Sequence, residues 1–253
     1  MPDMFSTWSS PPEQLVLAPD AVHVWLVELE AADSTVERDF AILSTDEQQR
    51  AERFRFPGGK RRYTIARGSL RRILAAYLEV EPASIRFRYS GLGKPLLGGP
   101  HLESDLSFNV AHSHELALIA VARQRAIGVD IEHVRQVRSF LELAERYFSP
   151  AEVAALRSIE GESAQLSAFL TAWTRKEALL KATGKGLSIS LDQVEVTMTP
   201  DEEPRLLRLD PAVQPAGPWQ MVHLDVDSDY LAALCYHGQP ARLATWKWPG
   251  LDL

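Results

Sequence analysis

Apolar residues recur along this chain with two spacings, and each spacing predicts a different kind of element. A spacing of three to four residues is typical of helices with one buried face. With the start signal at Ser44, it predicts helices at 45–54, 60–78, 141–148, 151–158 and 166–183. Alternating or continuous apolar runs predict strands at 22–29, 85–89, 106–110, 116–122, 127–132, 194–198, 221–224 and 231–236, with a loop over 91–100.

The order of these elements repeats, because each half of the chain has one long helix and several short strands. The segment HSHELALIA at 112–120 has a weak counterpart in DSDYLAALC at 227–235. We therefore expect an α+β fold of two pseudo-symmetric halves. Each half is a long helix packed on a small, mostly antiparallel sheet, and the active site lies between them. The expected division is an N-terminal arm, an N-terminal half, a C-terminal half and a C-terminal tail, at 1–20, 21–122, 123–240 and 241–253.

Composition and charge narrow the classes of function. The formal net charge of −7 argues against general affinity for nucleic acids. The single cysteine, Cys235, lies in an apolar run, which predicts a buried thiol and no disulfide. No segment is apolar enough to span a membrane, and the first residues lack the features of a signal peptide. We therefore expect a cytoplasmic protein.

Positive charge is concentrated in one segment of this acidic chain. Nine lysines and arginines lie between Arg50 and Arg72, and within that segment only Glu52 opposes them. Most charge runs are solvated helix faces, which is one explanation here. The density of cations favours another, namely a phosphate-binding segment on the predicted helix at 60–78.

The predicted helix at 166–183 carries an acid inside its apolar stripe. Glu177 follows Trp173 by four residues and precedes Lys181 by four, so the three side chains lie on neighbouring turns of one face. Gly184 can supply the left-handed residue that ends the helix. A surface Glu–Lys pair explains this pattern as well as an inward-facing functional carboxylate does.

Two more acids alternate with apolar residues in the predicted strand at 127–132. The apolar residues point to one face, and Asp130 and Glu132 point to the other. Taken alone, this pattern is typical of the wet face of a strand. Together with Glu177, however, these acids would form an all-oxygen cluster of the kind that suits Mg²⁺ or Mn²⁺.

Two weaker signals concern phosphate binding. His112 follows a predicted strand and opens a turn, where an imidazole can hydrogen-bond a phosphate. Lys94 lies in a loop between Gly93 and Pro95, and such a loop can approach an anion closely. A lone histidine is more often structural or merely exposed, and surface lysines are common, so each signal is weak by itself.

Taken together, the chain resembles the 4'-phosphopantetheinyl transferases, and in particular the larger Sfp-type class that works as a monomeric pseudo-dimer. The resemblance rests on four motifs in the family's order: GKP at 93–95, FNVAH at 108–112, GVDIE at 128–132 and WTRKEALLKATGKGL at 173–187. It implies transfer of the 4'-phosphopantetheine arm of coenzyme A to a serine of an acyl, peptidyl or polyketide carrier protein. Adenosine 3',5'-bisphosphate would be released.

The resemblance also implies a role for each acid and base. Asp130, Glu132 and Glu177 would hold Mg²⁺, or Mn²⁺, against the pyrophosphate. Glu177, or a water held by the acids, would take the proton from the carrier serine. Lys181 would neutralise phosphate charge as the bond to the leaving group breaks.

The nucleotide's phosphates would be held by Lys94, His112 and Arg67, with Arg71 as a competing candidate for the place of Arg67. One position departs from the family's pattern, because Ala111 stands where a serine usually precedes the histidine. Its missing hydroxyl predicts weaker coenzyme binding. Trp173 is expected to pack the helix and not to contact substrate.

Two other functions were weighed against this one. Another Mg²⁺-dependent phosphoryl or nucleotidyl transferase would use the same acids and arginines, although the chain has no G-x4-G-K-[ST] loop or kinase motif. A non-catalytic module could bind an acidic partner through 50–72, but it would have no use for Glu177. Carrier domains tend to be acidic, so a carrier must dock on a local surface of this acidic, monomeric protein. Candidates are Phe148, Leu166 and Leu187, which are equally well explained as core residues.

Overall fold

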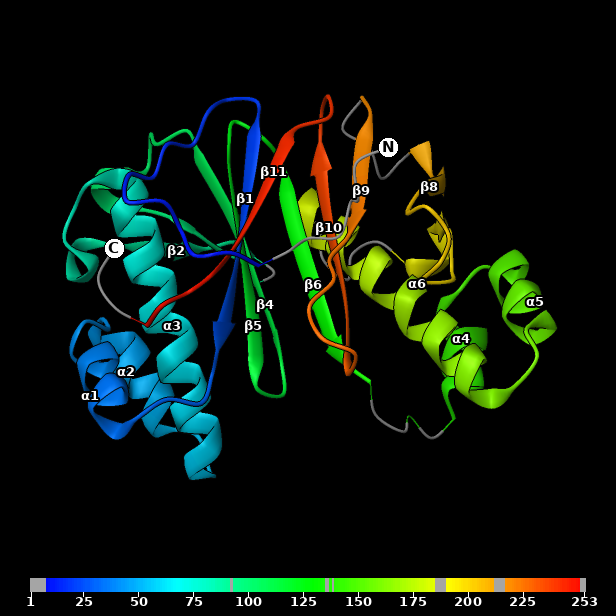
Figure 1. Ribbon diagram of the computed structural model, residues 1–253, viewed down its shortest axis with the longest axis horizontal. Coiled ribbons are helices and arrows are strands. Elements are labelled where there is room, and N and C mark those ends of the chain that lie inside the picture. Colours follow the sequence, from blue (N-terminus) through cyan, green and yellow to red (C-terminus); the bar gives the residue numbers. More distant parts are fainter. Residues whose placement is uncertain are drawn as a thin grey trace.

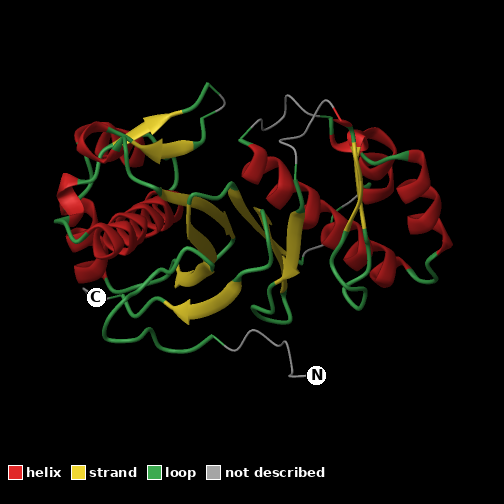
Figure 2. Ribbon diagram, turned by 90° about the horizontal axis from the view of Figure 1, so that it is seen from above, coloured by secondary structure: helices red, strands yellow, loops and turns green. Residues whose placement is uncertain are grey.

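The two central sheets of the molecule lie face to face, and helices cover their outer sides (Figure 1). The computed structural model describes residues 8–91, 93–134, 137, 139–184, 190–211 and 217–250. Seen from above, the helices form two groups at the ends of the molecule with strands between them (Figure 2). The expected α+β class, with a long helix and a small sheet in each half, is confirmed.

The N-terminal half is built on a sheet with the strand order β11-β1-β5-β4. Its long helix α3 begins at Pro57, whose ring suits a first helical turn, and ends before Glu79, which is left-handed with φ 53°. One face of α3 packs on the sheet through apolar residues such as Leu70 and Leu74, which meet Trp25 and Phe108. The elements of this half are β1 (Ala21–Glu28), α1 (Asp33–Ala41), α2 (Thr45–Glu52), α3 (Pro57–Leu78), β2 (Phe87–Tyr89), β3 (Pro95–Leu97), β4 (Leu106–Ser113) and β5 (Leu116–Arg123).

The C-terminal half is built on an antiparallel sheet with the order β6-β10-β9. Its long helix α6 ends at Gly184, which has the expected left-handed conformation with φ 69°. The elements are β6 (Ile127–His133), α4 (Phe140–Tyr147), α5 (Pro150–Ser158), α6 (Glu162–Thr183), β7 (Val194–Val196), β8 (Leu206–Leu209), β9 (Trp219–His223), β10 (Tyr230–His237) and β11 (Arg242–Lys247), of which β11 returns to the first sheet.

A separate apolar core joins the two halves. Val24 on β1 and Leu118 on β5 pack against Val129 on β6 and Leu234 on β10, and all four are fully buried. As the alternation predicted, the apolar residues of β6 share this core. The opposite face of β6 is therefore turned toward α6, which places its polar residues on the helix side.

Residues 242–247 of the expected C-terminal tail at 241–253 are part of the first sheet. These form β11, which pairs in parallel with β1 from Ala21 to Leu26. The physical reason is aromatic packing between distant residues, because the Trp246 ring lies 5.0 Å from that of Trp25. The described part of the expected N-terminal arm bridges this strand at Ser9.

Besides β11, helix α1 and strands β3 and β8 were not predicted. α1 is polar over most of its length, and its buried residue is Asp39, so it lacks an apolar stripe. β3 lies in the expected loop at 91–100 and pairs only with the short β2. Cys235 is fully buried, as predicted. Over the described residues, no helix combines the length and apolar character needed to cross a membrane.

Candidate active site

Strand β6 and helix α6 approach each other closely because Gly128 has no side chain. A Cβ atom at this position would lie 2.1 Å from the carbonyl oxygen of Ala178 and 2.3 Å from the backbone nitrogen of Ala182. Glycine is thus the residue that this contact allows. The close approach brings Asp130, two residues along the same strand face, against the turns of α6 that carry Glu177 and Lys181.

Asp130 and Lys181 form the central ion pair of the site. The Lys181 Nζ atom donates to Asp130 Oδ1 at 2.6 Å. Asp130 is 5% exposed, and its other oxygen, Oδ2, is buried without a hydrogen-bond partner among the described residues. Burial raises the pKa of Asp130, and the neighbouring Lys181 ammonium opposes that shift. One buried carboxylate oxygen is therefore left open to a further positive ligand.

Glu177 and Glu132 add negative charge around this pair. Burial raises the pKa of Glu177, and the charges of Asp130 and Glu132 raise it further against the effect of Lys181. Glu132 accepts a hydrogen bond of 3.3 Å from the Ser113 hydroxyl, which ties it to the end of β4. The surface Glu–Lys explanation for Glu177 thus gives way to a half-buried acid in an electrostatically coupled group.

The acids suit a divalent cation by their chemistry but do not surround one point. Three carboxylates with one partnerless oxygen form the oxygen-rich, repulsive set that Mg²⁺ or Mn²⁺ neutralises. Over the described residues, however, no three His, Cys, Asp or Glu side chains are grouped closely enough to hold one metal ion. The closed three-acid cluster that the residue pattern predicts is not formed over the described residues, and Asp130 is paired with Lys181.

Lys94 joins the two elements of the site from the N-terminal half. Its Nζ atom donates to the carbonyl oxygen of Ile127 at 3.2 Å and to that of Lys181 at 2.5 Å. Burial, followed by the charge of Lys181, lowers the pKa of Lys94 to about 8. The loop at 93–95 is thereby held against both β6 and α6, where its ammonium can meet an anion.

A cavity of about 420 Å³ opens beside Lys94, between the two halves. It is lined by cationic and apolar residues that include Arg88, Arg125, Phe108 and Gly184. No sequence motif contains the two arginines, because they come from separate segments of the chain. Lys94 lines this basic cavity and also contacts the backbone of Lys181, which links the cavity to the helix that carries Glu177.

His112 lies at the end of β4, exposed at the edge of the acid group. Desolvation by the protein atoms around the ring lowers the pKa of His112 most, and the charges of Lys181 and Arg50 lower it further. The imidazole is therefore neutral at pH 7. A neutral ring still carries one N–H donor for a phosphate. Asn109 braces this segment, because its Oδ1 accepts from the Val129 backbone N–H at 2.9 Å. Ala111, in the departure from the motif, is buried in the core between the sheets.

Arg67 is not brought to this group. Its Nε atom donates to Glu47 at 2.5 Å, another guanidinium nitrogen donates to the Tyr89 hydroxyl, and the side chain is nearly buried. Arg71 is 1% exposed and pairs with the other oxygen of Glu47 at 2.6 Å. Glu47, the acidic partner of both arginines, lies outside the basic segment. Phosphate binding by Arg67 remains a prediction.

Two buried cations in the α6 motif hold the helix in place, and sequence reasoning assigned neither. Lys176 is fully buried and donates to Glu152 at 2.5 Å and to two backbone carbonyls. Arg175 donates to the Thr197 carbonyl at 2.7 Å. Trp173 packs against Phe169 with ring centroids 5.8 Å apart, as expected. The end of the motif, 185–187, lies outside the described residues.

Known proteins similar to this chain carry one family name. Residues 126–235 match a family model described as "4'-phosphopantetheinyl transferase superfamily", and residues 30–124 match one described as "4'-phosphopantetheinyl transferase, N-terminal". The "4'-phosphopantetheinyl transferase HetI" of Nostoc sp. is 42% identical over 96% of this chain and 98% of its own length. The "4'-phosphopantetheinyl transferase Sfp" of Bacillus subtilis is 29% identical over 79% of this chain and 84% of its own.

Proposed function

The chain belongs to the 4'-phosphopantetheinyl transferase superfamily, and we propose that it moves the 4'-phosphopantetheine arm of coenzyme A to a serine of an apo carrier protein. The carrier is an acyl, peptidyl or polyketide carrier domain, and the enzyme acts as a monomer. One observation carries the assignment of the site, namely the pairing of the buried Asp130 carboxylate. One of its oxygens is paired to Lys181, and the other has no hydrogen bond among the described residues.

The reaction is a direct displacement at phosphorus. The carrier serine oxygen bonds to the phosphorus atom next to the pantetheine arm. The bond from that phosphorus to the bridging pyrophosphate oxygen breaks, and adenosine 3',5'-bisphosphate leaves. The serine proton passes to Glu177, or to a water held beside it. A carboxylate whose pKa burial and neighbouring acids raise is a stronger base than an exposed one.

Asp130, Glu132 and Glu177 are the residues that would hold Mg²⁺, or Mn²⁺. Such an ion neutralises the pyrophosphate charge and draws electrons from the phosphorus under attack. These acids serve no purpose toward an anionic substrate without a cation, since they would repel it. Asp130 also orients the Lys181 ammonium, which then lies one helical turn from Glu177.

Cations of both halves would hold the phosphates. Lys181 would neutralise the leaving group, and Lys94 would contact the nucleotide's phosphates at the basic cavity that it lines. The neutral His112 would add one N–H donor to these phosphates. Arg67 can bind a phosphate only if coenzyme A replaces Glu47 as the partner of its guanidinium group. Binding of coenzyme A by an Arg67→Ala variant, measured by calorimetry, checks that assignment, because weaker binding with unchanged saturated turnover is expected.

The transfer assay tests the function directly. The protein is incubated with coenzyme A, Mg²⁺ and a panel of apo acyl, peptidyl and polyketide carrier domains, and each carrier is weighed by mass spectrometry. We expect the mass of one phosphopantetheine group on at least one carrier, and none when Mg²⁺ is removed by a chelator. A panel that gains no mass at any carrier concentration overturns the proposal.

A further inference from the structure

The basic segment between Arg50 and Arg72 divides into two parts that differ in their partners. Each cation on α3, from Lys60 onward, has an acidic partner: Glu52, Asp33, Glu30, Glu47 or Asp39. The three arginines that precede α3 are different. Arg50, Arg53 and Arg55 are exposed, and none of them forms an ion pair with another described residue. Their positive charge is therefore available to a partner.

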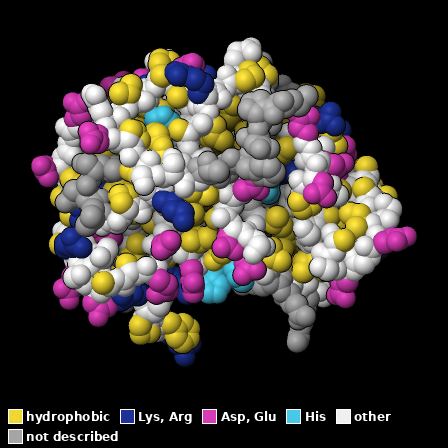
Figure 3. Space-filling view, in the orientation of Figure 1, with side chains coloured by type: hydrophobic (Ala, Val, Ile, Leu, Met, Phe, Trp, Pro, Cys, Tyr) yellow, Lys and Arg dark blue, Asp and Glu magenta, His cyan; other side chains and the backbone are white. Residues whose placement is uncertain are grey.

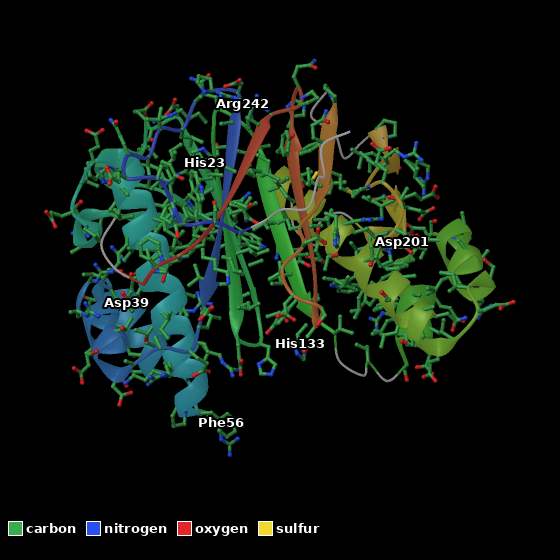
Figure 4. The ribbon with its side chains drawn as sticks, viewed as in Figure 1. His23, Asp39, Phe56, His133, Asp201 and Arg242 are labelled. Carbon is green, nitrogen blue, oxygen red and sulfur yellow. The ribbon has the colours of Figure 1, made fainter. Side chains whose placement is uncertain are left out.

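Two exposed phenylalanines stand among these arginines. Phe56 is 70% exposed and Phe54 is 42% exposed, in the short connection between α2 and α3. Figure 4 labels Phe56 at the lower end of α3, and Figure 3 shows hydrophobic and basic side chains projecting from the same edge. We call residues Arg53–Phe56 the RFRF patch. Exposed aromatic rings beside unpaired arginines are the composition of a protein-binding surface.

The RFRF patch is held in position by its surroundings. The Phe54 ring lies 5.4 Å from that of Tyr63, and the Arg50 guanidinium lies 5.5 Å from the same Tyr63 ring. Gly59 leaves room for Phe54, since a Cβ atom there would come within 2.9 Å of the ring. A patch braced in this way loses little conformational entropy when a partner binds.

The RFRF patch lies on the side of the molecule where the acid group ends. The charge of Arg50 reaches His112, whose pKa it helps to lower, and the charge of Lys181 reaches the same imidazole. In Figure 4, Phe56 and His133, the residue after Glu132, project from the same edge. The patch and the end of the strand that carries Glu132 therefore lie on the same side of the molecule in this view.

The surface considered earlier does not offer such a place. Phe148 is 3% exposed and its ring stacks on that of Phe169, with centroids 5.2 Å apart. Leu166 packs against the core of the C-terminal half. Leu187 lies outside the described residues. Phe148 and Leu166 are therefore covered, whereas Phe54 and Phe56 of the RFRF patch are exposed beside arginines that form no ion pair among the described residues.

We propose that the RFRF patch is the docking surface for the apo carrier protein, and this rests on the proposed function. A carrier domain with an acidic surface is repelled by a chain of net charge −7, so it needs a local positive surface to approach. Arg53 and Arg55 supply the attraction, and Phe56 enters an apolar depression of the carrier. The paired cations of α3 contribute little, because their charges are already neutralised.

Steady-state kinetics with two varied substrates test this surface. The variants are Phe56→Ala and the double change Arg53→Glu with Arg55→Glu. The control is Arg205→Glu with Leu207→Ala, an exposed basic and apolar pair at β8 in the other half. We expect the KM for the carrier to rise about tenfold in both patch variants, while kcat and the KM for coenzyme A stay within about twofold. The control variant keeps the carrier KM of the unaltered enzyme.

Each other outcome has a definite meaning. An unchanged carrier KM in both variants overturns the docking surface but leaves the transferase intact. A rise in the KM for coenzyme A instead assigns the arginines to the nucleotide, and it overturns the proposal too. Binding to vesicles of phosphatidylserine that is lost in the variants, with an unchanged carrier KM, makes the patch a membrane contact. If the unaltered enzyme modifies no carrier, the proposed function fails first.

Discussion

The buried carboxylates beside the two long helices differ in how completely the protein itself pairs them. Between α2 and α3, the Glu47 carboxylate of α2 accepts from Arg67 and Arg71 of α3, so both of its oxygens have partners. Between β6 and α6, Asp130 has one partner, Lys181, and stands near two further acids. The first arrangement is complete without a ligand, whereas the second leaves negative charge and one buried oxygen uncompensated. Chemistry is expected where the protein alone does not satisfy its polar groups.

The largest effect is expected at Asp130. Asp130→Asn keeps the shape of the side chain but removes the charge that Lys181 and a metal ion need. We expect kcat/KM for transfer to fall about 1,000-fold, as measured by mass spectrometry of the carrier. The melting temperature should change little, because the amide keeps the shape of the side chain and the Lys181 ammonium is partly exposed to water. Asp201→Asn, at an exposed position, is the matched control, and an active Asp130→Asn enzyme would refute the metal role.

The complete network on α3 predicts the reverse behaviour at Glu47. Glu47→Gln leaves two nearly buried guanidinium groups without their carboxylate, so the free energy of unfolding should fall by about 3 kcal/mol. Denaturant titration measures this loss. Glu52→Gln removes the exposed partner of Lys60 and should cost less than about 0.5 kcal/mol. Equal losses in the two variants would contradict a structural role for the buried network.

The approach of β6 to α6 is tested at Gly128. In Gly128→Ala the added Cβ overlaps the Ala178 carbonyl, so helix and strand must separate. We expect a loss of about 2 kcal/mol in the free energy of unfolding, together with slower transfer, because Asp130 and Lys181 move apart. Gly58→Ala is the control, since a Cβ there has no neighbour within 4 Å. A stable and fully active Gly128→Ala enzyme would show that the close approach is unnecessary.

The smallest effect concerns the pH dependence of Lys94. Its pKa of about 8 means that the ammonium loses its charge as the pH rises through that value. The affinity for coenzyme A should therefore fall between pH 7 and pH 9, by about threefold to tenfold in calorimetry. Lys94→Arg keeps its charge across this range and should show a flatter profile. A profile that is the same in both proteins would mean that Lys94 does not bind the phosphates.

Part of the fold was readable because it depends on local periodicity. The apolar spacing predicted α3 and α6 to within a few residues, and the alternation in β6 predicted which of its faces is apolar. Periodicity did not predict strand β11, because the position of this strand depends on pairing with β1 and on contact between Trp246 and Trp25. Periodicity did not predict helix α1 either, because its one buried residue, Asp39, is polar.

The candidate site, too, could be predicted from the sequence only in part. Local patterns and the order of the motifs selected Asp130, Glu132, Glu177, Lys181, Lys94 and His112, and the chemistry of those side chains follows from their types. The sequence did not determine that Lys94 holds the backbone of Lys181, or that Glu47 takes Arg67 and Arg71. Such partners lie tens of residues apart, and only packing decides which charges meet. The sequence by itself determined what chemistry is present, while the tertiary structure decided which cations are neutralised and which, at the RFRF patch, remain exposed.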